Sequence, residues 1–298
     1  MRIAFFAKDC SSYTVKRLAE EAVMEGHEVA CHNPLQVAIG PDSLLSGGAR
    51  LSGCDMAFVR TSVHAAEREF ILAVARHLEL GGVPVINPPG AIERSSNKFT
   101  TFQVLKGIGV PVVPSVALRS GEEAGAVIEA LGGFPLVVKL FYGSRGMGVT
   151  YATSQDMLVS LIDSYRALGV NVLVSPFLGE PRGRCLRVLC AGGEVIAAVH
   201  MASKPGDFRS NAARGGVIAG KEETEQCGGL AMRALSSLGL LAGSADLLAD
   251  RGRLMVLEVN SSPGIESLER ALGCSIAGPM LKALIEALAR DGRLPGGR

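Results

Sequence analysis

Apolar runs and amphipathic stretches alternate along the first third of the chain. The apolar runs predict four short strands, which cover residues 1–7, 27–33, 54–60 and 83–87. Residues 12–25 place apolar side chains on one face at helical spacing, and a second helix is expected near 65–80. Strands that alternate with helices predict a parallel sheet with helical crossovers. The run Pro88-Pro89-Gly90 then marks the end of this unit, which we assign to residues 1–93.

Beyond this boundary the pattern changes from parallel crossovers to antiparallel hairpins. Ser95 or Ser96 is expected to cap a helix that continues with apolar residues at helical spacing. Further helices are predicted near residues 121–131, 154–168 and 222–239. From residue 184 onward, apolar strands are joined by the short turns Gly192-Gly193 and Arg251-Gly252, which favour antiparallel hairpins. No G-x-G-x-x-G follows the first strand, so a dinucleotide site there is unsupported.

Composition and charge restrict the function classes. The chain has 298 residues, of which 48% are hydrophobic and 20% are charged, and its formal net charge is +1. These values are ordinary for a globular protein, whereas a general nucleic-acid binder would be more basic. No apolar run reaches the roughly 20 residues that span a bilayer, and the first run is too short for a signal peptide.

Cysteine usage gives a further indication. The seven cysteines are scattered, and no two form a C-x-x-C pair. This pattern argues against a disulfide framework or a structural zinc site and favours a reducing cytoplasm. Cys31 beside His32 resembles half of a metal site, but no second ligand pair accompanies it.

A glycine-rich stretch, LVVKLFYGSRGMGV, is the strongest local signal. Lys139 ends an apolar strand, and Gly143, Gly146 and Gly148 follow it closely. Glycines let backbone N–H groups approach a phosphate, and the lysine supplies a positive charge for it. The alternative is a glycine-rich hairpin with an incidental lysine. A lysine at the end of a buried strand favours the phosphate site, because an unpaired charge is costly there.

The stretch LMVLEVNSSPG provides oxygen ligands. Glu258 and Asn260 are two residues apart on a predicted strand, so both project from one face. A hairpin at Arg251-Gly252 brings Asp246 roughly opposite this pair. Two carboxylates and a carboxamide suit Mg²⁺ or Mn²⁺, and above all Mg²⁺ shared with ATP phosphates. The alternative, a solvated strand face, is weak because the neighbouring residues are apolar.

Residues 182–214 contain a local excess of arginine and lysine. Arg187 lies in an apolar strand, whereas Arg182 and Arg184 also fit an ordinary charged surface. Guanidinium groups bind carboxylates and phosphates through two hydrogen bonds. Two other motifs are rejected. The G-x-x-x-x-G-K run at 215–221 lacks the following Ser or Thr of a Walker A loop, and His200 has no partner spacing for a catalytic triad.

With these motifs in view, the chain from about Ser96 onward resembles RimK-type ATP-grasp ligases. The stretches that match are SSNKFTTFQVLKGIGVPVVPS, FPLVVKLFYGSRGMGV, GDFRSNAARGG and LEVNSSPGIESLERALGCSIAG. This family is related to glutathione synthetase and the lysine-biosynthesis ligases. The resemblance implies an α/β ATP-grasp fold behind a small Rossmann-like α/β domain. It divides the chain into a preceding domain (1–93), a central lobe with the glycine-rich loop (94–172) and a C-terminal lobe with the metal site (173–298).

The resemblance also implies roles for individual residues. The nucleotide contacts are Lys98, Lys139, Gly143, Ser144, Arg145, Gly146, Gly148, Ser175, Pro176, Phe177, Leu178, Glu180 and Lys204. Two Mg²⁺ ions, or Mn²⁺, would be held by Asp246, Glu258 and Asn260. The groups expected to face the phosphates, an acyl phosphate or a substrate carboxylate are Arg187, Arg209, Asn211 and Arg214.

Two departures from the family pattern concern the nucleotide. The family's acidic or amide pair before an aromatic residue is Ser175-Pro176 here, and a family aspartate before the strand arginine is Cys185. Adenine could still be bound by a carbonyl at 175 or 176 and by the N–H of Phe177 or Leu178, and Glu180 could reach a ribose hydroxyl.

The implied function is an ATP-dependent carboxylate–amine ligase that works through an acyl phosphate. An amino acid, often glutamate in this family, would be joined to an acceptor molecule or peptide. The alternatives are a small-molecule ligase of the glutathione-synthetase or lysine-biosynthesis type, and a catalytically weak ATP-binding module. The glycine-rich loop and residues 209–216 are expected to act as lids. Nucleic acid and membrane partners are not expected, the location is expected to be cytoplasmic, and the relatives suggest a homo-oligomer.

Overall fold

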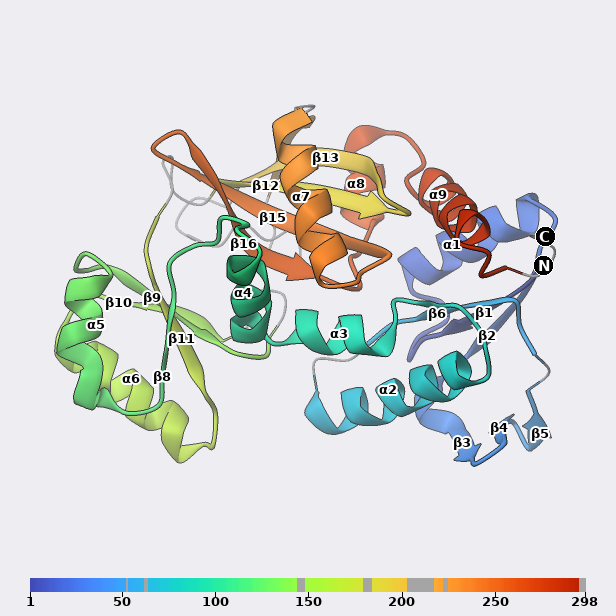
Figure 1. Ribbon diagram of the computed structural model, residues 1–298, viewed down its shortest axis with the longest axis horizontal. Helices are drawn as coiled ribbons and strands as arrows, with labels where there is room; N and C mark the ends of the chain where they lie inside the picture. Colours follow the sequence, from blue (N-terminus) through green and yellow to red (C-terminus); the bar gives the residue numbers. More distant parts are fainter. Residues whose placement is uncertain are drawn as a thin grey trace.

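The computed structural model describes residues 1–51, 53–61, 64–143, 148–178, 184–202, 217–221 and 225–294, with backbone alone for 217–221. Three groups of elements follow one another along the chain and lie from right to left and then to the upper centre of Figure 1. Each group is built around its own main sheet.

The first group is a parallel sheet, as predicted. Its strand order is β2-β1-β6-β7. All three strand pairs are parallel. The strands are β1 (Arg2–Phe6), β2 (Glu28–His32), β6 (Met56–Val59) and β7 (Val85–Ile86). Helix α1 (Tyr13–Met24) lies against one face, and α2 (Ala65–Leu80) covers the other.

The connection from β2 to β6 differs from the prediction of helical crossovers. It holds a 3-10 turn, η1 (Pro34–Gln36), and a small antiparallel meander of β3 (Val37–Gly40), β4 (Ser43–Ser46) and β5 (Ala49–Arg50). Val37 and Leu44 from this meander are buried on the same face as α2, so the meander takes the place of a helix in covering the sheet.

Two short helices connect the first group to the second. Helix α3 (Pro89–Ser96) starts inside the run that was predicted to be a boundary, because proline is well tolerated in a first helical turn. Helix α4 (Lys98–Gly107) is capped by Asn97, whose side chain accepts hydrogen bonds from the backbone of Phe99 (3.0 Å) and Thr100 (3.2 Å). The predicted serine cap was wrong, because the hydroxyls of Ser95 and Ser96 bond back to carbonyls within α3.

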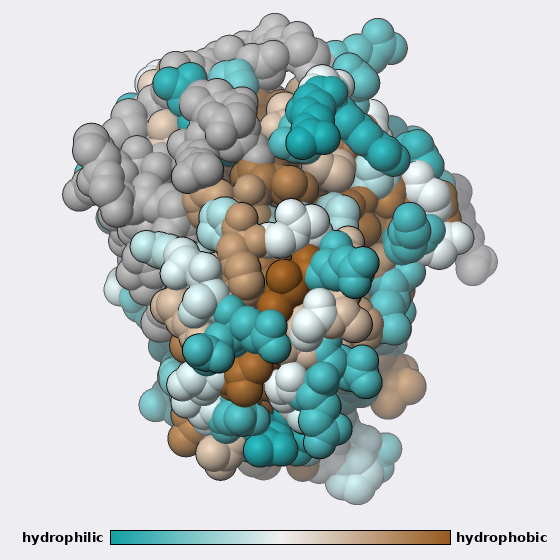
Figure 2. All heavy atoms as spheres, turned by 90° about the vertical axis from the view of Figure 1, so that its left-hand side faces the viewer, coloured by the Kyte–Doolittle hydropathy of each residue, from teal (hydrophilic) through white to brown (hydrophobic). Residues whose placement is uncertain are grey.

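The second group is an antiparallel sheet in the order β10-β9-β11-β8. Its strands are β8 (Val116–Leu118), β9 (Leu136–Leu140), β10 (Val149–Ala152) and β11 (Val172–Pro176). After the 3-10 turn η2 (Gly121–Glu123), helices α5 (Ala124–Ala130) and α6 (Gln155–Ala167) cover one face and close a separate core. On the outside of this lobe, apolar residues form small areas divided by polar ones (Figure 2).

The third group is an antiparallel sheet in the order β14-β13-β12-β15-β16. Its strands are β12 (Arg184–Ala191), β13 (Glu194–Ala202), β14 (Val217–Lys221), β15 (Ala242–Asp250) and β16 (Arg253–Asn260). Both predicted hairpin turns are confirmed: Gly192-Gly193 and Arg251-Gly252 have positive φ angles, as two-residue hairpins require. Residues 217–221 form a strand, which also excludes a phosphate-binding loop there.

Helices cover both faces of this sheet. Helix α7 (Glu225–Ser237) packs on one face, while α8 (Glu266–Leu272) and α9 (Ala277–Arg290) lie on the side of the N-terminal domain (Figure 1). Buried residues of α9, such as Leu281 and Leu284, belong to one hydrophobic core with Phe5 of β1 and Leu189 of β12. The first and third groups of elements therefore share a core, whereas the central lobe has its own.

No single helix in the described ranges has the length and apolarity to cross a membrane. Only α8 and α9 taken together, although sharply bent against each other, reach that length and composition.

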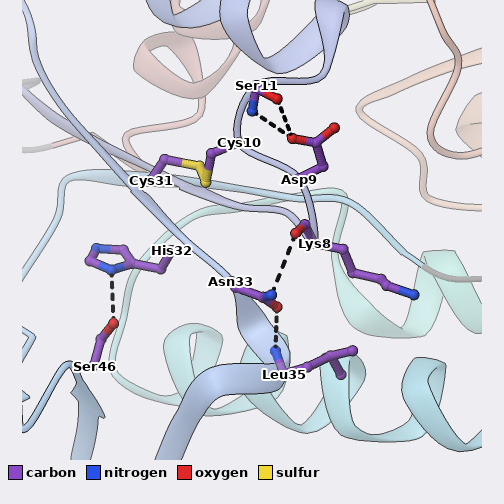
Figure 3. Close-up of a disulfide and its surroundings, with 9 residues drawn as sticks. All are labelled: Lys8, Asp9, Cys10, Ser11, Cys31, His32, Asn33, Leu35 and Ser46. Carbon is purple, nitrogen blue, oxygen red and sulfur yellow. Dashed lines mark hydrogen bonds between the residues drawn. A yellow bond between two sulfur atoms is a disulfide. The ribbon is translucent and has the colours of Figure 1, made fainter.

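One disulfide contradicts the expectation from cysteine spacing. Cys10 follows β1, and Cys31 lies in β2, the parallel neighbour of β1. Their Cα atoms are 6.0 Å apart and their sulfur atoms are bonded (Figure 3). The expectation failed because residues 21 apart in sequence meet at the same edge of a parallel sheet. Cys31 offers no thiolate in this bond, so the Cys31–His32 pair is not half of a metal site, and His32 is hydrogen-bonded to Ser46 Oγ at 3.2 Å (Figure 3).

Candidate active site

Carboxylates on β15 and β16 face each other across the hairpin, where the register shifts by one residue between Asp246 and Leu247. Asp246 is the direct cross-strand partner of Glu258, and Ser244 is the partner of Asn260. Residues at alternate positions project from the same face of a strand, so the carboxyl and carboxamide oxygens of Glu258 and Asn260 share one face. Asp246 is 4% exposed. The predicted strand pairing is confirmed, while metal binding by these residues stays a prediction.

Basic side chains from two other elements reach these carboxylates. Lys98, the first residue of α4, places its Nζ 2.9 Å from Glu258 Oε1. Arg187 of β12, the strand next to β15, binds Asp246 through two hydrogen bonds of 2.7 and 2.8 Å. The sequence predicted that each of these residues contributes to the site but did not predict that they would pair in this way.

Lys139 occupies a different electrostatic position. It lies on β9 between Val149 of β10 and Leu173 of β11 and is half-buried. No described residue forms a hydrogen bond or ion pair with its ammonium group. Burial lowers the pKa of Lys139 from 10.5 to about 8; nearby Glu258 opposes this change and Lys98 reinforces it. A second anion beside Lys139 would restore its usual pKa, which is the behaviour expected of a phosphate-binding lysine.

The same charges act on their partners. Burial raises the pKa of Glu258, but the positive charges of Lys98, Lys139 and Arg187 overcome this effect and hold the pKa below its usual range. The Asp246 carboxylate raises the pKa of the Arg187 guanidinium. The site therefore brings two carboxyl groups together with three basic side chains.

The start of the glycine-rich loop is attached to α4 and to the N-terminal domain. The backbone N–H of Lys98 donates to Phe141 O (2.9 Å), and its Nζ donates to Gly143 O (2.8 Å). Between them, the ring of Tyr142 lies 4.4 Å from the guanidinium carbon of Arg68 on α2. Contacts of this kind with an aromatic face are attractive. The sequence did not indicate Arg68 or Tyr142, because such contacts between separate elements leave no periodic pattern.

The end of this loop requires a glycine. Gly148 has a φ of +69°, and a Cβ atom there would lie 2.5 Å from the Leu140 side chain. A larger residue would therefore be both strained and in collision with its neighbour. This gives Gly148 a backbone role in starting β10, beside the phosphate role that the sequence predicted.

In the segment proposed to bind adenine, some of the backbone groups already have hydrogen-bond partners. Ser175 and Pro176 end β11, and Ser175 is buried. The N–H of Phe177 already donates to Pro135 O at 3.1 Å, so of the two alternatives, Phe177 or Leu178, only the N–H of Leu178 stays a prediction for the adenine ring. Leu178 then supplies the candidate N–H. It packs beside Val113 and Met255, at the edge between the central and C-terminal lobes.

Several predicted site residues lie outside the described residues, and their roles stay predictions. They are Ser144, Arg145, Gly146, Glu180, Lys204, Arg209, Asn211 and Arg214.

The fold and this site together define a class of enzyme. A glycine-rich loop on one antiparallel sheet, a carboxylate pair on a second, and basic side chains between them are the arrangement of an ATP-grasp enzyme. The model of the RimK-like ATP-grasp domain matches residues 95–284, and that of the RimK PreATP-grasp domain matches residues 1–92. The chain belongs to the RimK-like ATP-grasp family and is an ATP-dependent, ADP-forming ligase.

Individual relatives agree with this assignment. A "Probable alpha-L-glutamate ligase" of Serratia proteamaculans (strain 568) is 36% identical over 303 residues and covers 100% of both chains. A "Ribosomal protein bS6--L-glutamate ligase" of Salmonella newport (strain SL254) is 37% identical over 287 residues, which are 95% of each chain.

Solved structures show the same fold at lower identity. The ATP-grasp ligase PsnB complexed with minimal precursor has a TM-score of 0.76 at 22% identity and covers 96% of this chain and 98% of its own. The D-cycloserine synthetase DcsG has a TM-score of 0.75 at 19% identity, covering 97% of this chain and 100% of its own.

Proposed function

We propose that this protein activates a carboxylate with ATP and then joins it to an amine. The observation that carries the proposal is the charge cluster in which Lys98 lies 2.9 Å from Glu258, with Asp246 opposite Glu258 and Lys139 nearby. Cations of this kind bind phosphate oxygens, and carboxylates beside them hold a divalent ion.

The donor set fits magnesium. Asp246, Glu258 and Asn260 each offer a side-chain oxygen as a ligand, which Mg²⁺ prefers, and a related structure of PsnB is complexed with Mg and ADP. When bound, Mg²⁺ would neutralise negative charge on the phosphates of ATP. Lys98 and Lys139 would add positive charge beside the same oxygens, and Arg187 orients the Asp246 carboxyl group through two hydrogen bonds.

These residues support a reaction without a protein nucleophile. The oxygen of the substrate carboxylate attacks the γ-phosphorus of ATP, and the bond to ADP breaks. Lysines held in place before the reaction stabilise the charge on the transferred phosphoryl group. The amine then attacks the acyl carbon, phosphate leaves with the electron pair of its bond to that carbon, and the amine loses a proton.

For the substrates we propose an amino acid and a peptide or protein acceptor. The named relatives act, by their names, on L-glutamate and, for one of them, on a ribosomal protein. Glutamate is therefore the first amino acid to test. A small-molecule acceptor is the second candidate, because a chain of the same fold is a D-cycloserine synthetase.

The test measures ADP release with ATP, glutamate and a panel of peptides, followed by mass spectrometry of the products. Hydroxylamine in place of the amine should trap an acyl phosphate as a hydroxamate. Glu258→Gln should abolish turnover, whereas Glu129→Gln on the exposed surface of α5 should not. Wild-type ADP release by Glu258→Gln would show that the proposed site is wrong.

A further inference from the structure

The segment that follows the metal strand is held by side chains of the N-terminal domain. Directly after Asn260, three consecutive carbonyls accept hydrogen bonds from two residues. Asn87 Nδ2 donates to Ser261 O (2.7 Å), and the Arg60 guanidinium donates to Ser262 O (3.2 Å) and Pro263 O (3.3 Å). Asn87 follows β7 and Arg60 follows β6, so both lie at the carboxyl edge of the parallel sheet.

Asn87 uses every hydrogen bond that its side chain can make. Besides Ser261 O, its Nδ2 donates to Ala242 O (2.7 Å), and its Oδ1 accepts from Leu241 N and Ala242 N, both at 2.8 Å. A carboxamide offers two N–H groups and two lone pairs, so none is left over. The residue is 2% exposed, and water therefore cannot replace any of these partners.

The position of Asn87 explains why the contact matters for the site. The pairing of β15 with β16 ends at Ser244 and Asn260. Beyond this pair the Asn87 carboxamide bridges the two segments, bonding Ala242 on one side and Ser261 on the other. The strand ends are also close, because a Cβ atom on Gly243 would lie 2.9 Å from Asn260 O. The Asn87 side chain thus makes the hydrogen bonds that a further pair of β15 and β16 residues would otherwise make.

We propose that Asn87 and Arg60 are positioning residues of the metal site, which fix the end of β16 so that Asn260 faces Asp246 and Glu258. This inference rests on the proposed metal role of those three residues. It makes the N-terminal domain a part of the catalytic centre, beyond any part that it has in binding substrates. Neither residue touches the reacting atoms; both act through the backbone next to Asn260.

The experiment compares two arginines that make the same kind of contact. Arg94 of α3 also donates to a backbone carbonyl of the C-terminal lobe, Leu238 O, at 3.1 and 2.8 Å. Leu238 lies between α7 and β15, and not in the segment that follows Asn260. Arg60→Lys and Arg94→Lys should therefore have similar effects on thermal stability but different effects on metal binding.

Mn²⁺ binding to the full chain, followed by electron paramagnetic resonance with saturating ADP, is the readout. We expect Arg60→Lys and Asn87→Asp to weaken Mn²⁺ binding about ten-fold, which is the effect of losing groups that orient metal ligands. Arg94→Lys should leave Mn²⁺ binding unchanged. Higher metal concentration should restore turnover in the Arg60→Lys variant, because its ligands are all present.

Glu258→Gln separates the possible failures. If Glu258→Gln abolishes Mn²⁺ binding while Arg60→Lys and Asn87→Asp bind as tightly as the wild type, the positioning proposal is overturned and the metal site stands. If Glu258→Gln also binds normally, the metal site itself is wrong. Arg60 is partly exposed, so its lysine variant provides the test even if Asn87→Asp does not fold.

Discussion

The Arg187–Asp246 pair allows stability and catalysis to be separated by a double-mutant cycle. Its side chains are 17% and 6% exposed and are joined by two hydrogen bonds. Removing one partner of such a buried pair costs about 3–5 kcal/mol, because the other charge is left uncompensated. Replacing both partners by apolar residues of similar size is often neutral.

The charges around the pair predict which of the two single substitutions lowers the free energy of unfolding more. Glu258 lies near Arg187 and would partly compensate its charge in the Asp246→Leu variant. We therefore expect Asp246→Leu to lower the free energy of unfolding by about 3 kcal/mol, the lower end of this range. Among the described residues, Asp246 forms an ion pair with Arg187 alone, so Arg187→Met should lie near the upper end, about 5 kcal/mol. The double variant Arg187→Met/Asp246→Leu should unfold within about 1 kcal/mol of the wild type.

Urea unfolding at equilibrium measures the three free energies, and ADP release measures turnover. The double variant should be stable yet inactive, because the carboxylate proposed to bind metal is absent. A double variant as unstable as Arg187→Met would refute the argument from uncompensated charge. A double variant that keeps magnesium-dependent turnover would show that Asp246 is not a metal ligand.

Three further outcomes are expected. ATP affinity, measured by calorimetry, should fall above about pH 8 in the wild type, because Lys139 then loses its proton. Lys139→Arg should remove this pH dependence. If the variant keeps the pH dependence of the wild type, Lys139 is excluded from the phosphate site. Thiol titration of the denatured, unreduced protein should find five free cysteines, and titration after reduction should find seven. Breaking the Cys10–Cys31 bond should lower the free energy of unfolding by about 3 kcal/mol, as expected for a closed loop of this length. Arg209→Lys should reduce turnover but not ATP affinity, since it keeps the charge and loses the paired hydrogen bonds; loss of ATP binding would place Arg209 in the nucleotide site instead.

The parts of the site that the sequence predicted are those fixed by local geometry. A two-residue turn sets the register of a hairpin, so Arg251-Gly252 was enough to place Asp246 roughly opposite Glu258 and Asn260. The regular register would pair Asp246 with Leu257, and an irregularity between Asp246 and Leu247, which the sequence did not predict, moves the partner to Glu258. Strand periodicity then put Asn260 on the same face. The parallel sheet of the N-terminal domain was predictable for a similar reason, since each strand and helix has its own apolar period.

The parts that were not predicted depend on which elements meet in space. Asn97 rather than a serine caps α4, because the chain leaves α3 only at that residue. Cys10 and Cys31 meet because β1 and β2 are neighbours in the sheet. Asn87 and Arg60 bond to backbone carbonyls, which every residue has, so no sequence pattern marks their partners.

The charge cluster gives a physical reason for ordered binding in this site. Lys98, Lys139 and Arg187 outnumber Glu258 and Asp246, and burial, reinforced by the charge of Lys98, lowers the pKa of Lys139. A phosphate beside Lys139 removes that penalty, whereas a divalent cation arriving alone would add to the positive excess. Lys98 is already bonded to Glu258, so a cation that binds Glu258 must compete with it. The arrangement therefore favours metal that arrives together with ATP, whose phosphates compensate both the cation and the lysines.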